Sequence, residues 1–319
     1  MKKIFIYLVV AVFAVMISAC SNATQNKQQT EEKPGLPADA ILIKYQRHLY
    51  CDVMLRDSIP ARMIFDTGCT NLLLDSTFYA DKFGDSGNLR RAMLSGAGGG
   101  MELANIDASG WWYNVGSETN TEDVATVLNL RKIVGDGVDG MFGMIFMQGK
   151  RVELNYADNY MRFLPIDEKI DDDFIRIQCN WLDNTKMRIL LPLSIALSDG
   201  YVFEGNYLVD TGMPGTLMLN NTTANTLKAQ QHLSDARKEI NAIGGIGGSS
   251  EEYLFNVSQI TIGGYTIKDV QASWSGNKQG ALADMGYDGL VGNELLDRFD
   301  VICDFVDCAI YLRPNNTSK

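Results

Sequence analysis

The chain has 319 residues with 28 basic and 39 acidic side chains, a formal net charge of −11, six cysteines and only two histidines. The acidic excess argues against nucleic acid and anionic lipid as partners, because both repel negative charge. The scarcity of histidine argues against a cysteine–histidine enzyme and against a histidine-based metal site.

The first residues have the features of a secretory signal. Met1-Lys2-Lys3 is positive, Ile4 to Val15 is apolar, and Ile17-Ser18-Ala19-Cys20 is a small-residue cleavage site that ends on cysteine. Because this end resembles a bacterial lipobox, we expect residues 1–19 to be removed and Cys20 to be lipidated. An ordinary signal peptide, or a membrane helix of about the minimum spanning length, is the alternative. The lipoprotein interpretation predicts a lipid-anchored protein of the bacterial cell envelope, in a leaflet that the sequence does not identify.

Residues 20–40 are expected to be a tether. Ser21 to Ala38 is polar and has almost nothing to bury, which is typical of a disordered segment. Removal of Lys2 and Lys3 with the signal leaves 28 − 2 = 26 basic against 39 acidic residues, a net charge near −13.

From Ile41 onward, short alternating apolar runs separated by Gly, Asn, Asp and Ser predict an all-β protein. Helical periodicity is scarce. We expect a short helix over Ser76 to Phe83 and a longer one over Asn221 to Ile240, each just after a repeated motif.

That motif is Asp-Thr-Gly, which occurs at Asp66-Thr67-Gly68 and again 144 positions later at Asp210-Thr211-Gly212. Each copy follows apolar residues and is followed by more of them, so each carboxylate is expected at the end of a strand in a tight, half-buried loop. If two halves pack about a pseudo-twofold axis, the two carboxylates meet and share a proton.

Two further features repeat. Glycine clusters occupy residues 95–100 and 243–248, and Val138 to Met144 matches Tyr287 to Asn293 at an offset of 149. The strands Arg151 to Tyr156 and Asp300 to Phe305 should follow. We therefore expect an N-terminal lobe over residues 41–165, a connecting segment over 166–190, and a C-terminal lobe over 191–319.

Together these motifs resemble the aspartic peptidases, with one Asp-Thr-Gly per half as in the pepsin-like enzymes and a plainer sequence style similar to retropepsin-like proteins. The resemblance covers about residues 41 to 314. It implies a bilobal, pepsin-like double β-barrel of two similar halves and an endopeptidase acting on peptide or protein substrates. No metal or other cofactor is implied, and a monomer is sufficient because one chain supplies both motifs.

The resemblance also assigns roles. Asp66 and Asp210 would activate a water molecule, and the remaining motif residues, Thr67, Gly68, Thr211 and Gly212, would support the pair. The glycine clusters would be flaps that close over the substrate, through Gly96, Gly98, Gly99, Gly244, Gly245 and Gly247. Ordinary glycine-rich turns are the alternative for each cluster.

Two departures from the family pattern concern the residues that follow the motifs and the flap. Cys69 and Met213 stand where related enzymes usually have Ser, Thr or Ala. No tyrosine is assigned to the flap; Trp111, Trp112 and Tyr113 are interpreted as core aromatics. Cys69 and the other cysteines after Cys20 are interpreted as buried packing residues.

Two other functions remain open. A lipoprotein that has lost catalysis could bind a peptide or glycan in the same cleft. A metal-binding β-protein using the acidic run Asp171 to Asp173 is a weaker alternative, since the run is equally typical of a solvated linker.

Overall fold

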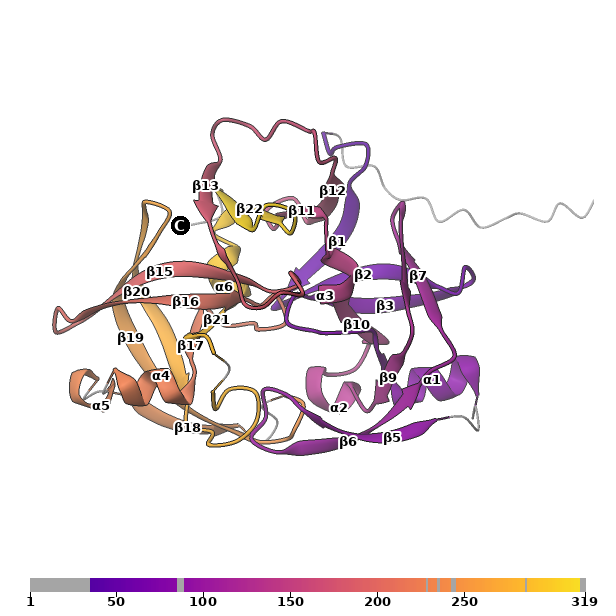
Figure 1. Ribbon diagram of the computed structural model, residues 1–319, viewed down its shortest axis with the longest axis horizontal. Coiled ribbons are helices and arrows are strands. Elements are labelled where there is room, and N and C mark those ends of the chain that lie inside the picture. The colour runs from indigo at the N-terminus through magenta and orange to yellow at the C-terminus, as the bar shows by residue number, and fades with distance from the viewer. Residues whose placement is uncertain are drawn as a thin grey trace, which may run out of the picture. The chain divides into compact units, whose positions relative to one another are not determined.

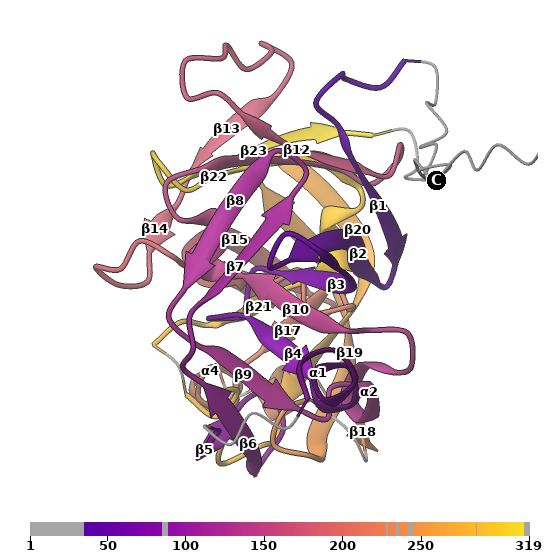
Figure 2. The ribbon, with the colours of Figure 1, turned by 90° about the vertical axis from the view of Figure 1, so that its right-hand side faces the viewer.

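A computed structural model describes residues 35–84, 89–227, 229–233, 236–241, 245–284 and 286–315. The chain from Pro37 onward forms one compact unit (Figures 1 and 2). It is half strand and one-tenth helix, which confirms the expected all-β class.

The described residues of the N-terminal half form twelve strands and three short helices. The strands are β1 Ile41–Gln46, β2 His48–Leu55, β3 Ile59–Asp66, β4 Leu73–Asp75, β5 Arg90–Ser95, β6 Met101–Asp107, β7 Trp111–Val115, β8 Glu118–Glu122, β9 Ala125–Leu128, β10 Gly140–Gly143, β11 Arg151–Asn155 and β12 Tyr160–Leu164. The helices are α1 Ser76–Phe83, α2 Arg131–Val134 and α3 Met144–Met147.

The C-terminal half has a matching set of elements. The strands are β13 Ile175–Gln178, β14 Asn180–Trp181, β15 Ile189–Leu197, β16 Val202–Val209, β17 Leu217–Leu219, β18 Arg237–Asn241, β19 Ser250–Ile262, β20 Tyr265–Ser275, β21 Gly289–Val291, β22 Phe299–Asp304 and β23 Ala309–Pro314. The helices are α4 Asn221–Thr226, α5 Ala229–His232 and α6 Asn293–Leu296.

Six strands of the C-terminal half close into a barrel. The pairing runs β15, β16, β21, β17, β20 and β19, and β19 pairs back with β15. The N-terminal half follows the same order through β2, β3, β10 and β4. There, β8 with β9 takes the place of β20, and β6 with β7 takes the place of β19, with β7 pairing back to β2.

The two halves meet through a shared sheet in the order β13, β23, β22, β11, β12 and β1. At its centre β11 and β22 run antiparallel, with Arg151 opposite Asp304 and Asn155 opposite Asp300. This order is symmetric about the β11–β22 pair, as expected for a duplicated chain. Both views place these strands together, away from the β5 and β18 edge (Figures 1 and 2).

Strand β3 shows how the core supports the first Asp-Thr-Gly loop. Met63 and Phe65 point into the main core, and Phe65 packs against Phe142 of β10 with 5.4 Å between ring centroids. Ile64 points to the other face but is also fully buried, in a smaller apolar cluster. A strand covered on both faces has little freedom, so the loop that follows Phe65 is held firmly.

The expected helix over Ser76 to Phe83 is confirmed as α1, whose first turn is capped by the Asp75 carboxylate. The longer helix expected over Asn221 to Ile240 is wrong. Among the described residues of this range, α4 and α5 are the helical ones, and Arg237–Asn241 is strand β18, paired antiparallel with β19. The long β19 edge offers backbone hydrogen bonds that outweigh a weak helical pattern.

Candidate active site

Both Asp-Thr-Gly loops follow a central strand of a barrel. Strand β3 ends at Asp66, and strand β16 ends just before Asp210. Each runs parallel to the strand formed by the repeated apolar–glycine segment of its own half, β10 in Val138 to Met144 and β21 in Tyr287 to Asn293. The chain that leaves each segment bonds back to the loop, since the Met144 amide donates to Cys69 O and the Asn293 amide to Met213 O, both at 2.9 Å.

The two threonines tie the loops together. The Thr67 amide donates to Thr211 Oγ1 at 3.0 Å, and the Thr211 amide donates to Thr67 Oγ1 at 2.9 Å. Each hydroxyl then donates to a backbone carbonyl of the opposite half, Thr67 to Val209 O and Thr211 to Phe65 O, at 2.6 and 2.8 Å. Both side chains are buried. The two loops are therefore bonded to each other by equivalent hydrogen bonds from both halves.

This arrangement brings the two carboxyl groups together. The Asp66 and Asp210 side chains share a hydrogen bond. The Gly68 amide donates to Asp66 Oδ1 at 2.7 Å and the Gly212 amide to Asp210 Oδ1 at 2.9 Å. A Cβ on Gly68 would lie 2.8 Å from Asp210 Oδ1, and one on Gly212 would collide with the Asp66 carboxyl. Glycine is thus required at both positions for this approach.

Burial raises the pKa of both carboxyl groups, because the charged form loses its solvation. For Asp210, the negative charge of Asp66 and the hydrogen bond between them raise the pKa further. For Asp66, the Gly68 amide and the Asp210 side chain oppose the increase. The two carboxyl groups therefore titrate as a pair that shares one proton.

The described parts of the glycine clusters lie at two hairpin tips, residues 96–100 between β5 and β6 and residues 245–249 between β18 and β19. The tips bond to each other, because the amides of Gly98, Gly99 and Gly100 donate to Ile246 O, Ser249 O and Gly247 O at 2.8 to 3.0 Å. Gly96 O accepts from Ala281, and Gly245 contacts Ala97. Gly244 is not among the described residues.

Each tip reaches an apolar cluster beside the opposite loop. Ile246 packs on the cluster that contains Ile64 and Cys69, and Ala97 packs on the cluster that contains Leu208 and Met213. Since Cys69 and Met213 directly follow the two motifs, the joined tips lie over the residues that flank the carboxyl pair.

The residues in doubt from the sequence have clear positions. Cys69 is buried, burial raises the pKa of its thiol, and its Sγ donates to Asn71 O at 3.0 Å. Trp111 and Tyr113 are core aromatics, as interpreted, but the interpretation is wrong for Trp112, which is exposed because successive side chains of strand β7 point to opposite faces. The five described cysteines are all buried and unpaired.

Two residues near the loops were missed from the sequence. His48 is 18 positions from Asp66 in the sequence. Strand β2 pairs antiparallel with β3, with Leu49 opposite Phe65, so the register places His48 opposite Asp66. Its ring bonds to the backbone of Gly212, and its buried Nδ1 has no partner among the described residues. Burial lowers the pKa of His48, with a further contribution from Arg47.

Asn293 is the second missed residue. Its fully buried Nδ2 donates to Thr211 O at 2.7 Å and to Arg47 O at 2.9 Å, and its Oδ1 accepts from Tyr156 at 2.9 Å. It directly follows Gly292 of the repeated segment, but nothing local in the sequence shows which loop it would reach. Asn293 thus fixes the second Asp-Thr-Gly loop from the side.

No protein-family model matches the chain, and no curated protein matches its sequence. Within the described ranges, no group of three or more His, Cys, Asp or Glu side chains could hold a metal ion. The helices among those residues are all too short or too polar to cross a membrane. The expected signal and Cys20 fall in residues 1–34, which the structure does not describe.

Proposed function

We propose that this protein is an aspartic endopeptidase that hydrolyses peptide bonds with a water molecule activated between Asp66 and Asp210. The observation that carries the proposal is the reciprocal threonine contact, which holds two Asp-Thr-Gly loops face to face with their carboxyl groups hydrogen-bonded. Local packing alone would not require two separate loops to share four buried hydrogen bonds and two close glycine contacts.

The fold supports the same proposal. The two halves follow one pairing order, and they join in a sheet that is symmetric about β11 and β22. We interpret this arrangement as the pepsin-like double barrel, in which each barrel supplies one catalytic loop.

In the proposed reaction, Asp66 starts ionised and Asp210 starts protonated. A water molecule held between the carboxyl groups gives a proton to ionised Asp66 as its oxygen forms a bond to the peptide carbonyl carbon. Protonated Asp210 donates its proton to the carbonyl oxygen, which gives a neutral tetrahedral intermediate. Its collapse breaks the carbon–nitrogen bond, Asp66 returns its proton to the leaving amine, and Asp210 regains its own from the hydroxyl. Each general acid or base contributes about 10²- to 10⁴-fold to the rate.

The joined tips would act as flaps. A peptide chain can reach the carboxyl pair only if the three hydrogen bonds between the tips open, because Ile246 and Ala97 now cover the flanking clusters. Apolar side chains of the substrate would then pack on these clusters in place of Ile246 and Ala97.

We further propose that Cys20 anchors the protein by lipid to a membrane of the bacterial cell envelope and that residues 20–40 tether the folded unit. One chain supplies both loops, so the proposed enzyme works as a monomer.

The test is cleavage of an unbiased peptide library between about pH 3 and 7 by protein lacking residues 1–20. We expect wild-type protein to cut, pepstatin to inhibit, and Asp66→Asn and Asp210→Asn to abolish cleavage. A folded protein that cuts nothing at any pH would instead support a binding module for a peptide or glycan. One observation favours that alternative: the Cys69 thiol bonds to Asn71 O, so it does not support the Asp66 carboxylate as a serine hydroxyl would.

A further inference from the structure

The internal repeat allows one position to be compared between the two halves. Asp139 and Asp288 both precede the glycine of the repeated segment. The Asp139 amide donates to Arg62 O at 2.9 Å, and its carboxylate accepts from the Arg62 amide at 3.0 Å. Asp288 makes the same two bonds with Asn206, at 2.9 and 2.7 Å. The two aspartates are therefore structural equivalents.

In the N-terminal half, an arginine of the chain itself completes the position. Arg131 Nη2 donates to Asp139 Oδ1 at 2.9 Å, and its Nε donates to Val138 O at 3.2 Å. The same Nε lies 3.5 Å from Asp75 Oδ1. A planar guanidinium between two carboxylates and a carbonyl is a geometry that arginine suits better than any other side chain.

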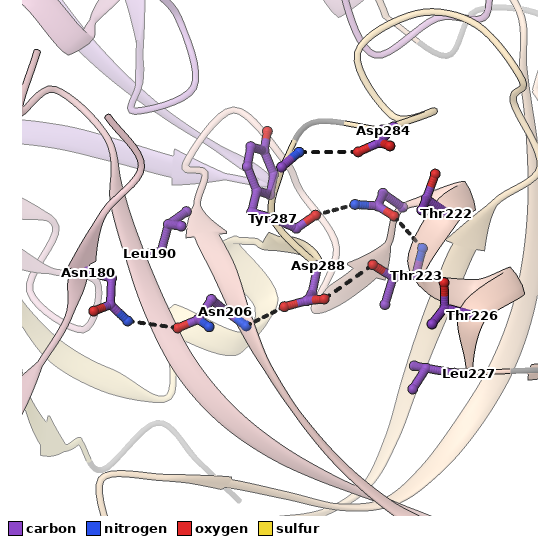
Figure 3. Close-up of a pocket in the computed structure, with 12 residues that line it drawn as sticks. Asn180, Leu190, Asn206, Thr222, Thr223, Thr226, Leu227, Asp284, Tyr287 and Asp288 are labelled. Carbon is purple, nitrogen blue, oxygen red and sulfur yellow. Dashed lines mark hydrogen bonds between the residues drawn. The ribbon is translucent and has the colours of Figure 1, made fainter. Parts of the chain in front are cut away.

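In the C-terminal half, the equivalent position is a pocket of about 400 Å³ (Figure 3). No lysine or arginine is among the described residues that line it. Asn220 stands where the first half has Asp75, and it donates to Tyr287 O, the equivalent of Val138 O. Among the residues that the structure describes, Asp288 Oδ1 receives a 3.3 Å hydrogen bond from the Thr223 hydroxyl.

Negative charge is nevertheless retained. Asp284 is exposed and lines the same pocket as Asp288, and its Oδ1 accepts from the Gly286 amide at 3.3 Å. Asn and Thr side chains supply the other polar groups of the lining. The second half thus keeps the carboxylate equivalent to Asp139 and has another at Asp284, but Asn220 replaces Asp75, and no arginine is among the described residues that line the pocket.

The pocket shares a wall with the carboxyl pair. Leu190 and Tyr287 line it and also belong to the apolar cluster with Met213, which follows the second motif. Burial, and then the nearby charge of Asp210, raise the pKa of Tyr287. A peptide bound across the carboxyl pair could therefore place one of its side chains in this pocket.

We propose that the pocket lined by Asp284, Asp288 and Tyr287 binds the guanidinium group of an arginine side chain on a peptide in the cleft. The assignment of that arginine to a substrate rests on the proposed function. The guanidinium would pair with Asp288 as Arg131 pairs with Asp139, and Asp284 would supply the second carboxylate.

The test separates binding from cleavage by using the full chain carrying Asp66→Asn. Calorimetric titrations would compare N-acetyl-arginine amide with N-acetyl-citrulline amide, which has nearly the same shape and no charge. We expect the arginine compound to bind at least about tenfold more tightly. Asp284→Asn should weaken its binding at least about threefold and Asp288→Asn more, whereas Asp136→Asn, in the matching turn of the first half, should leave it unchanged.

Equal affinity for both compounds, binding of neither, or an Asp284→Asn variant that binds like wild type would overturn the proposal. Asp284 is exposed, so this variant is expected to fold even if Asp288→Asn does not. The outcomes for pocket and enzyme are distinguishable. If the Asp66→Asn protein binds arginine selectively but the wild-type protein cuts no peptide, the pocket proposal stands and the peptidase proposal fails. If the wild-type protein cuts peptides but no arginine-selective binding is found, the peptidase proposal stands and the pocket proposal fails.

Discussion

The two Asp-Thr-Gly loops share one set of contacts and differ in another. Thr67 and Thr211 exchange equivalent hydrogen bonds, but the last residue of the repeated segment is Met144 in the first half and Asn293 in the second. Asn293 bonds to the second loop through Thr211 O, whereas the thioether of Met144 has no N–H to donate. The duplicated contacts therefore bring the carboxyl groups together, and the unequal ones make the surroundings of Asp66 and Asp210 differ.

The barrels differ in a similar way. Strand β19 is continuous over Ser250–Ile262, but its counterpart is divided into β6 and β7. The pairing order is unchanged despite this break. The order of pairing, rather than the length of any strand, thus determines where the loops lie.

The most severe test of the symmetry is removal of one threonine hydroxyl. Thr67→Val leaves Val209 O and the Thr211 amide without their buried partner, and Thr211→Val does the same to Phe65 O and the Thr67 amide. At about 1–3 kcal/mol for each unsatisfied group, each change should lower the free energy of unfolding by roughly 2–6 kcal/mol. Urea unfolding measures this loss, and the two variants should agree.

The same variants should lose at least about 100-fold in kcat/KM, because small displacements of reacting groups are costly. Thr119→Val is the matched control, since its hydroxyl bond to Asn114 is exposed, and it should change stability by less than about 0.5 kcal/mol. If Thr67→Val behaves like this control, the reciprocal contact does not hold the loops.

The next largest effect should come from making the second half resemble the first. Asn293→Met removes the donors to Thr211 O and Arg47 O and the acceptor for the Tyr156 hydroxyl. We expect a loss of roughly 2–5 kcal/mol in the free energy of unfolding, measured in urea, and a lower kcat. Met144→Leu, the matched change in the first half, should cost less than about 1.5 kcal/mol. Equal losses would show that Asn293 acts only by filling space.

The sequence was sufficient to predict features that depend on residues close together in the chain. The repeated Asp-Thr-Gly, the apolar–glycine segments and the alternating apolar runs each carry their own signal, and the structure shows the loops, strands β10 and β21, and mostly β content. The hairpin tips were also predictable, because glycine clusters between short strands favour turns.

Contacts set by pairing between distant strands could not be predicted. Asn293 reaches Arg47, 246 positions away, and His48 meets the Asp66 loop only through the β2–β3 register. For β18, the helical pattern of the segment was misleading, because its partner strand lies beyond the glycine cluster. The pocket at Asp288 became visible only by comparison with Arg131 in the folded first half.

A smaller effect distinguishes the two aspartates by pH. A carboxyl whose pKa is raised by folding stabilises the native state at low pH, and this stabilisation is lost as the pH rises from the ordinary aspartate range through the folded pKa. Asp210→Asn should therefore raise the melting temperature relative to wild type more at pH 7 than at pH 4. For a chain of this size 1 kcal/mol corresponds to about 2–4 °C.

Asp66→Asn should show a smaller difference between the two pH values, because its hydrogen bonds oppose the effect of burial. Thermal melts of both variants from pH 4 to 7 compare them directly. A larger pH-dependent gain for Asp66→Asn would place the proton on Asp66 and exchange the proposed roles of acid and base.

The smallest effect is expected at Cys69, which differs from Met213 in being a potential nucleophile. Burial keeps the pKa of its thiol well above the usual range, and Sγ donates to Asn71 O, so the reactive thiolate is suppressed. Cys69→Ala should therefore retain cleavage within about threefold of wild type, and iodoacetamide should not modify this cysteine in the folded protein. Peptide cleavage and mass spectrometry measure both. If Cys69→Ala instead abolishes cleavage as completely as Asp66→Asn, the Cys69 sulfur takes part in the reaction. The two loops would then be symmetric in structure but not in catalysis.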